Sequence, residues 1–453
     1  MSRVALDAIR ACLEGAVPAT LATCDAQGVP NVAYLSQVEY VDPKHVALSF
    51  QFFNTTRRNV IANPVARLVV TDPETVARYR LLIRYLRTET SGPLFERMRA
   101  KLAGIASHTG MAGVFRLQGS DVYAVEDIER MPGEIVMAPA GSRRNLLAAV
   151  RACTRRMGSA ADLASLLDAT LQGIREEFGI EHAMILVLDP AGERLYTVAS
   201  MGYPESGVGS EIALGQGVVG VAARERSPIR IGHATSEYAY GLAVRESALR
   251  EGLALETQIP LPGLAGSRSQ LAVPIEAFGR VAGVLFLDSP EDLRFGYDDE
   301  DAMAAVAAQL GSGMHALQSA EASEVDGASA AAAPAKPAPA PGPALLVRHF
   351  AENDSVFLGD EYLIKGVAGA IFWALLQDYV GRGRTRFTNR ELRLDSRVRL
   401  PDLADNLEAR LILLEKRLAE REAPVRIEKT GRGQFRLRVS TPLQLAAVSA
   451  GPR

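Results

Sequence analysis

The sequence predicts a multidomain protein made of a β-barrel, an α/β domain and a small α+β domain. Three observations predict this. Short alternating apolar segments fill residues 1–135, helices flank alternating strands across 143–320, and a proline-rich linker precedes a basic module at 345–443. With 453 residues and 48% hydrophobic content, the chain is long enough for about three ordinary domains.

The linker, residues 321–344, contains the segment ASAAAAPAKPAPAPGP. Alternating Ala and Pro favour an extended polyproline II strut that forms no packed core. The charge changes across this linker. From 382 to 438 there are 16 Lys/Arg against 9 Asp/Glu, a net +7, so the rest of the chain carries −10 within the overall −3. A basic module predicts a polyanionic partner, although a basic face is also typical of plain solvated surface.

Cysteine usage and the N-terminus indicate the compartment. Cys12, Cys24 and Cys153 have no metal-like spacing, which fits a reducing cytoplasm without disulfides. The first helix, MSRVALDAIRACLEG, is amphipathic and unlike a signal peptide, and no apolar run reaches about 18 residues. We expect a cytoplasmic protein that does not contact a membrane. No residue pattern predicts a catalytic centre or a metal site.

Antiparallel strands are predicted by short alternating segments at 19–23, 32–37 and 45–50. The segment SFQFFNTTRRNVIANP at 49–64 follows them, at a strand-to-helix junction. Its adjacent arginines suit a phosphate, because guanidinium forks match phosphate oxygens and a helix N-terminus adds partial positive charge.

This order of elements resembles the pyridoxamine-phosphate-oxidase-like, FMN-binding split-barrel family over about residues 15–130. The resemblance implies that the arginine segment binds the FMN phosphate, that the preceding strand faces the flavin ring, and that the protein is a homodimer. The matching positions are Ser49, Gln51, Asn54, Thr55, Thr56, Arg57 and Arg58. A long, charged and mostly helical stretch at Val76–Ile105 departs from the family and is expected to reshape or cover the pocket. A barrel without cofactor that only dimerises stays an alternative.

Helices and strands alternate from 143 to 320. Apolar residues recur at helical spacing from Leu163 to Phe178, behind a capping signal formed by Ser159 and Asp162. A closing helix carries an apolar stripe at positions from Met303 onward. Strands are predicted at 183–188, 195–200, 270–275 and 281–287. The expected fold is an antiparallel sheet flanked by helices.

The phrases GQGVVG at 215–220, SQLAVP at 269–274 and GVLFLD at 283–288 resemble a GAF domain. The resemblance places a small-molecule ligand between the sheet and the variable loop 233–256. The implied contacts are Gln216, Tyr238, Tyr240 and Arg245. The chain lacks the signature of cyclic-nucleotide GAF domains and a cysteine for bilin attachment. A GAF domain that only dimerises and relays a signal stays an alternative.

The basic module has its own order of elements. We expect a hairpin at 356–364, a helix from Val367, a capping box at Thr388–Glu391, a third helix starting at Pro401, and a basic hairpin at 425–439. This order resembles the winged-helix domain of OmpR-type response regulators. In such domains the third helix enters the major groove of DNA and the wing reaches the backbone. The implied DNA contacts are Arg397, Arg399, Arg410, Lys416, Arg417 and Arg432.

One departure weakens DNA readout by the third helix. Ile412 and Leu413 make its middle apolar all round, and Leu413 replaces the polar side chain that such regulators present to bases. An apolar outer face is typical of a protein contact.

The leading hypothesis is therefore a homodimeric one-component transcriptional regulator that senses a flavin or another small molecule and binds DNA. The alternatives are an FMN-dependent oxidoreductase with regulatory domains and a protein-interaction scaffold.

Overall fold

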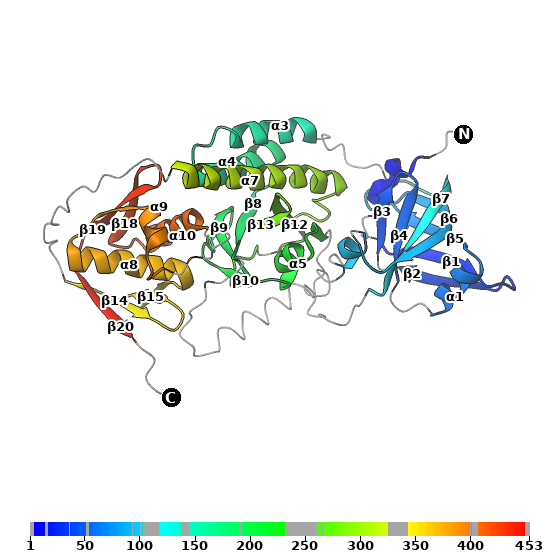
Figure 1. Cartoon of the computed structure of the whole chain (residues 1–453). Helices are drawn as coiled ribbons and strands as arrows, with labels where there is room; N and C mark the ends of the chain where they lie inside the picture. Colours follow the sequence, from blue (N-terminus) through cyan, green and yellow to red (C-terminus); the bar gives the residue numbers. More distant parts are fainter. Residues whose placement is uncertain are drawn as a thin grey trace.

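The computed structural model contains three folded regions in chain order, coloured blue to cyan, green, and yellow to red in Figure 1. We name them the N-terminal domain, the middle domain and the C-terminal module. The structure describes residues 4–13, 17–35, 37–50, 54–92, 94–99, 102, 117–136, 145–189, 193–231, 259, 261–264, 266–324, 343–398, 400 and 406–448.

The N-terminal domain is built on a seven-stranded sheet in the order β2-β1-β5-β6-β7-β4-β3. Its elements are η1 (Leu6–Leu13), β1 (Ala19–Cys24), β2 (Pro30–Leu35), β3 (Val38–Asp42), β4 (His45–Phe50), α1 (Asn54–Ala62), β5 (Val65–Thr71), β6 (Arg78–Glu89) and β7 (Gly119–Arg130). All strand pairs are antiparallel, as predicted. Alternate residues such as Leu48, Leu68 and Leu81 fill the main core.

The predicted helix within 76–105 is wrong for its first half, which forms strand β6. Leu81 and Ile83 point inward in strand alternation, and β6 pairs with β5 on one side and β7 on the other. Its charged residues are not a helix surface, because Arg80 and Arg84 form ion pairs with glutamates of β7. Among the described residues of this stretch, helix occurs at 94–99 and 102.

The middle domain is an antiparallel sheet in the order β10-β9-β8-β13-β12-β11. Helices α3, α4 and α7 pack on one face, and α5 packs on the other. The elements are α3 (Leu146–Met157), α4 (Leu163–Phe178), β8 (His182–Asp189), β9 (Arg194–Met201), β10 (Glu211–Ala213), α5 (Gly217–Glu225), β11 (Ile229–Ile231), β12 (Ser269–Ala277), β13 (Arg280–Ser289) and α7 (Tyr297–Glu324). The cap of α4 differs from the prediction: Asp162 is the N-cap and exchanges hydrogen bonds with Ser165, not Ser159.

The C-terminal module combines two sheets, β16-β15-β14-β20 and β17-β19-β18, with three helices. The elements are β14 (Leu345–Phe350), β15 (Ser355–Leu358), β16 (Glu361–Ile364), α8 (Gly366–Arg382), β17 (Arg386–Thr388), α9 (Asn389–Leu394), α10 (Leu407–Glu420), β18 (Val425–Gly431), β19 (Gln434–Val439) and β20 (Leu443–Val448). The capping box of Thr388 and Glu391 is present. The module extends beyond 443, because β20 pairs in parallel with β14.

Helix α10 begins at Leu407, and Pro401, where the sequence predicts its start, lies outside the described residues. Asn406 has φ of 44°, a left-handed conformation that interrupts a helix and that Asn tolerates better than most residues. Hydrogen bonds of the Asn406 side chain hold this residue in place. Asn406 Nδ2 donates to the carbonyl of Leu188 at 2.9 Å, and its Oδ1 accepts from Gln318 Nε2 at 3.2 Å. The side chain thereby ties the start of α10 to the middle domain.

Helix α7 contacts all three regions. Its 28 residues give a length of about 42 Å. Tyr297, at its start, lies in the core of the N-terminal domain, and Arg10 pairs with Asp301 one turn later at 3.1 Å. Gln318, near its end, contacts the C-terminal module through Asn406. One hydrophobic cluster also runs continuously through the middle domain and the C-terminal module. The two regions that flank the linker are therefore packed together (Figure 1).

Candidate functional sites

The predicted phosphate ligand Arg57 is held inside the N-terminal domain. Its Nη1 donates to Asp121 Oδ1 at 2.6 Å and to Thr88 Oγ1 at 2.7 Å, and its guanidinium lies 4.9 Å from the Phe50 ring centre. Burial raises the pKa of Asp121, while Thr88 and Arg57 act to lower it. A phosphate on Arg57 would therefore compete with a buried carboxylate.

The neighbouring candidates divide into buried and exposed residues. Thr56 is buried and accepts a hydrogen bond from Asn31 Nδ2 at 2.9 Å. Thr55 and Arg58 are exposed on the first turns of α1, where Arg58 Nη2 donates to Thr55 Oγ1 at 3.3 Å. The helix starts at Asn54, as the cluster predicted, but the Asn54 side chain and Gln51 lie outside the described residues.

Ser49 lies on the opposite face of the sheet. It pairs in register with Ser120, next to Ala47, which packs on helical segment 94–99. The side-chain oxygens of Ser49 and Ser120, and Oε1 of Gln37, are buried without a hydrogen-bond partner among the described residues. Among the described candidates, Ser49 therefore lies on the other face of the sheet from Arg57. Of the described phosphate candidates, Arg58 and Thr55 are the exposed ones.

The candidate ligand residues of the middle domain are mostly outside the described residues. Gln216 is the exposed N-cap of α5, whereas Tyr238, Tyr240 and Arg245 lie outside the described ranges.

Sequence reasoning missed a polar corner on the α5 side of the sheet. The His182 and Tyr203 rings are 5.5 Å apart, and the Tyr203 hydroxyl is buried without a hydrogen-bond partner in the described part of the chain. Asp288, opposite His182 in register, is 3% exposed. Burial raises the pKa of Asp288 to about 6. The sequence did contain a signal for this corner, because Asp288 is a charged residue directly after the apolar strand residues of the phrase GVLFLD.

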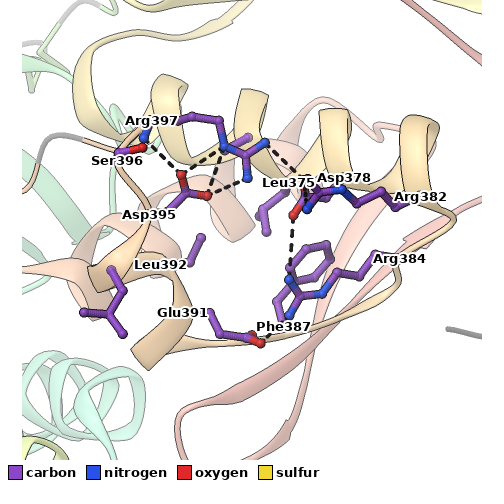
Figure 2. A pocket seen from close by; sticks show the side chains of 12 residues that line it. Leu375, Asp378, Arg382, Arg384, Phe387, Glu391, Leu392, Asp395, Ser396 and Arg397 are labelled. Atoms are coloured by element: carbon purple, nitrogen blue, oxygen red, sulfur yellow. Dashed lines mark hydrogen bonds and ion pairs between the residues drawn. The ribbon is translucent and has the colours of Figure 1, made fainter. Parts of the chain in front are cut away.

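A pocket of about 370 Å³ lies in the C-terminal module between α8, β17, α9 and the turn that follows. Figure 2 shows that Arg397 and Arg384 both reach the buried Asp378. Arg397 also binds Asp395, and Arg384 binds Glu391 at 2.5 Å. The hydrogen bond from Arg397 lowers the pKa of Asp395 below its usual value. The charged side chains that line the pocket are therefore paired with one another, and Arg397 is held by Asp378 and Asp395.

Helix α10 is closed in by the middle domain. It packs against β9 and α4, and Ile412 and Leu413 are only 6% and 5% exposed. The Arg410 guanidinium lies 3.2 Å from Asp189 Oδ2 and is 5% exposed. Leu413, the residue that departs from a DNA-reading helix, therefore contacts protein within the chain, beside Gly209.

Further polar contacts surround this interface. Lys429 of β18 binds Asp162 at 2.6 Å, Lys416 lies 3.7 Å from Asp168, and Lys365 lies 3.2 Å from Glu211. Ser206 Oγ donates to Glu420. Cations of the module thus meet carboxylates of the middle domain.

The predicted DNA contacts are accordingly scattered. Arg417 is buried and donates to the Leu363 carbonyl and to Glu420 of its own module, whereas Arg410 pairs with Asp189 of the middle domain. Arg432 is exposed in the β18–β19 turn. Arg399 lies outside the described residues.

Comparisons with known proteins find family matches for the N-terminal and middle domains. Residues 5–125 match the family model described as pyridoxamine 5'-phosphate oxidase, and residues 162–314 match the GAF domain model. The chain therefore carries a pyridoxamine-phosphate-oxidase-like domain followed by a GAF domain. No curated protein matches the chain.

Three solved structures illustrate the similarity. The GAF domain of an Acinetobacter phosphoenolpyruvate-protein phosphotransferase is 22% identical, over 38% of this chain and 94% of that one, with a TM-score of 0.31. The free methionine-R-sulfoxide reductase of Neisseria meningitidis is 19% identical over 41% and 97%, with a TM-score of 0.32. An FMN-binding protein of Syntrophomonas wolfei is 18% identical over 28% and 86%, with a TM-score of 0.25.

Two further observations concern metals and membranes. Within the described ranges, no group of three or more His, Cys, Asp or Glu side chains is arranged to hold a metal ion. No helix in the same ranges is both long and apolar enough to cross a bilayer.

Proposed function

We propose that this protein is a ligand-sensing regulator, with the first two domains as inputs and the C-terminal module as a DNA-binding output of the winged-helix type. The observation that carries the proposal is the contact of α10 with the GAF domain. Because Arg410 pairs with Asp189 and Leu413 lies beside Gly209, a change in the GAF domain would act directly on the output module and would not need the linker.

Ligand control requires unequal affinity for two arrangements of the chain. The GAF elements that hold α10, strand β9 and the end of β8, belong to the same sheet that carries His182 and Asp288. A ligand on that sheet would alter the support of α10 and so reposition the module, within a homodimer that presents two copies to DNA.

The test uses the full chain. Mass spectrometry identifies the small molecule that co-purifies, and fluorescence anisotropy measures binding to duplex DNA at about 50 mM salt, where phosphate contacts are strongest. We expect DNA binding whose affinity changes when the identified molecule is removed. No binding at low salt contradicts the proposed output.

A flavin-dependent oxidoreductase is the second candidate, favoured by the family match of residues 5–125 and by the exposed donors at the start of α1. Arg58 and Thr55 would hold the phosphate of FMN, which supplies hydride-transfer chemistry when bound. We expect Arg58→Ala to weaken FMN binding about tenfold, because one charge-assisted contact is lost. Flavin fluorescence titration measures this.

The control is Arg57→Lys, at the residue already paired with Asp121. It is expected to lower thermal stability more than FMN affinity. Equal FMN affinity in the wild type and Arg58→Ala contradicts the phosphate assignment, and oxidation of reduced nicotinamide by the FMN-loaded protein favours the enzyme over the regulator.

A further inference from the structure

The charged residues on the outer face of the small sheet β17-β19-β18 are mostly arginines. Its inward positions, including Phe387, Phe435 and Ile427, are buried in the module. Alternation places the intervening side chains on the other face. The charged residues there are Arg386, Arg426, Glu428, Arg436 and Arg438.

Cross-strand register places like charges directly opposite each other. Arg386 pairs with Arg436, and Arg426 pairs with Arg438. Such pairs are destabilising. Glu428 offsets part of this, since it binds Arg436 at 2.8 Å and Arg438 at 2.7 Å.

Two arginines remain without a carboxylate. Among the described residues, neither Arg386 nor Arg426 forms an ion pair, and both are exposed. Four arginines and one glutamate leave a net charge of +3 on this face. The fold thus accepts a local electrostatic cost at a surface that is open to solvent, and an anionic partner would relieve it.

The position of this face matters because α10 is closed in. The helix that the resemblance assigns to the major groove has Leu413 beside Gly209 of the GAF domain and Arg410 paired with Asp189. The arginine face belongs to the same module but does not take part in that contact, so it is accessible while α10 remains docked.

We infer that the outer face of β17-β19-β18 binds the phosphate backbone of double-stranded DNA while α10 anchors the module to the GAF domain. The inference rests on the proposed DNA-binding output and deepens it. Arginine suits this partner because its planar fork pairs with two phosphate oxygens and is less strongly hydrated than lysine. Backbone binding of this kind is independent of base sequence and falls with salt.

The experiment measures anisotropy of a labelled duplex of arbitrary sequence with the full chain, from about 50 to about 200 mM salt. The test variant carries Arg386→Glu and Arg426→Glu. We expect affinity to fall at least about tenfold at low salt, and the slope of log affinity against log salt to decrease by about 2, since each phosphate contact contributes about 0.9.

The matched control carries Arg130→Glu and Arg280→Glu, two exposed arginines on other domains with the same change in net charge. It is expected to retain wild-type affinity and slope. A second variant, Arg386→Lys with Arg426→Lys, keeps the charge and is expected to retain the slope with a smaller loss of affinity.

Four outcomes overturn the inference. If the test variant binds DNA like the wild type, DNA contacts another surface. The proposed DNA-binding output then stands, but not through this face. If both glutamate variants lose affinity equally, net charge alone is responsible. If the test variant instead changes the sedimentation coefficient, the occupant is a second copy of the chain. Failure of the wild type to bind DNA at about 50 mM salt overturns the proposed output as well.

Discussion

Asp288 is a carboxyl group sealed inside the GAF domain at the end of β13. Ser267 Oγ donates to Asp288 Oδ1 at 2.5 Å. Burial raises the pKa of Asp288 to about 6, and the Ser267, Ser289, Gln270 and Leu264 hydrogen bonds only partly oppose it. Asp288 accepts hydrogen bonds from Ser267 and Leu264 and so holds the segment before β12 in place. Near neutral pH this requires a charged carboxylate in a buried site, which costs free energy.

This cost predicts a pH dependence of stability. The folded pKa of Asp288 is above the unfolded value, so the folded state binds more protons between about pH 4 and pH 6. The free energy of unfolding should therefore fall by about 2 kcal/mol as pH rises through this window. Denaturant unfolding at a series of pH values measures it. Asp288→Asn should flatten this contribution, and an unchanged slope in the variant contradicts the assignment.

At the scale of elements, α10 has two buried sides. Leu414 and Leu418 are fully buried in the hydrophobic cluster, while Leu413 lies beside Gly209 where α10 packs on the middle domain. Burying a leucine stabilises by about 1.5–3 kcal/mol, so this second contact is substantial.

Leu413→Glu should loosen α10 from the GAF domain, because a carboxylate cannot be buried there without a partner. We expect faster hydrogen–deuterium exchange in α10 and β9, with little change in the N-terminal domain. Leu394→Glu is the matched control, since Leu394 is 76% exposed in the same module. Equal exchange in α10 for both variants contradicts a docked helix.

The order of elements was largely predictable from the sequence, because hydrophobic period and turn residues are local signals. Three features were not. Strand β6 has charged residues that pair across to β7, so its alternation resembled a polar helix. Asn406 breaks a helix through a contact with Leu188, far away in sequence. Strands β20 and β14 pair in parallel although they are far apart in the sequence, so no turn motif between them predicts the pairing.

The candidate sites were less predictable for a related reason. Sequence identified Arg57 and Arg410 by residue type and motif, but their partners, Asp121 and Asp189, come from distant strands. The apolar Leu413, where a DNA-reading helix usually has a polar residue, did predict a protein contact, and Leu413 is buried beside Gly209.

At the scale of the whole molecule, α7 connects the domains through Tyr297. Its ring packs in the core of the N-terminal domain, with Arg10 and Arg230 stacked 4.5 Å and 4.2 Å from the ring centre. Arg99 adds a second bridge by pairing with Glu225 of α5 at 2.5 Å. Side chains of the N-terminal domain and of the GAF domain therefore contact each other at two places on their boundary.

Tyr297→Ala should uncouple these two domains. Removing a buried aromatic ring costs about 3 kcal/mol, and here the loss falls on the boundary, so calorimetry should show the unfolding transition separating into two. Tyr297→Phe is the matched control, because it keeps the ring and removes the hydroxyl, which donates to the Leu13 carbonyl at 3.3 Å. A single transition in the alanine variant, shifted as a whole, contradicts coupling through this residue.

The two-sided burial of α10 also has an evolutionary consequence. A helix that reads DNA can vary at its outer positions as its target sequence changes, but 412 and 413 are tied to the surface of another domain. Substitutions at these positions and at Asp189 should therefore co-vary among related chains, and a relative with polar residues at 412 and 413 should also have lost the acidic partner of Arg410.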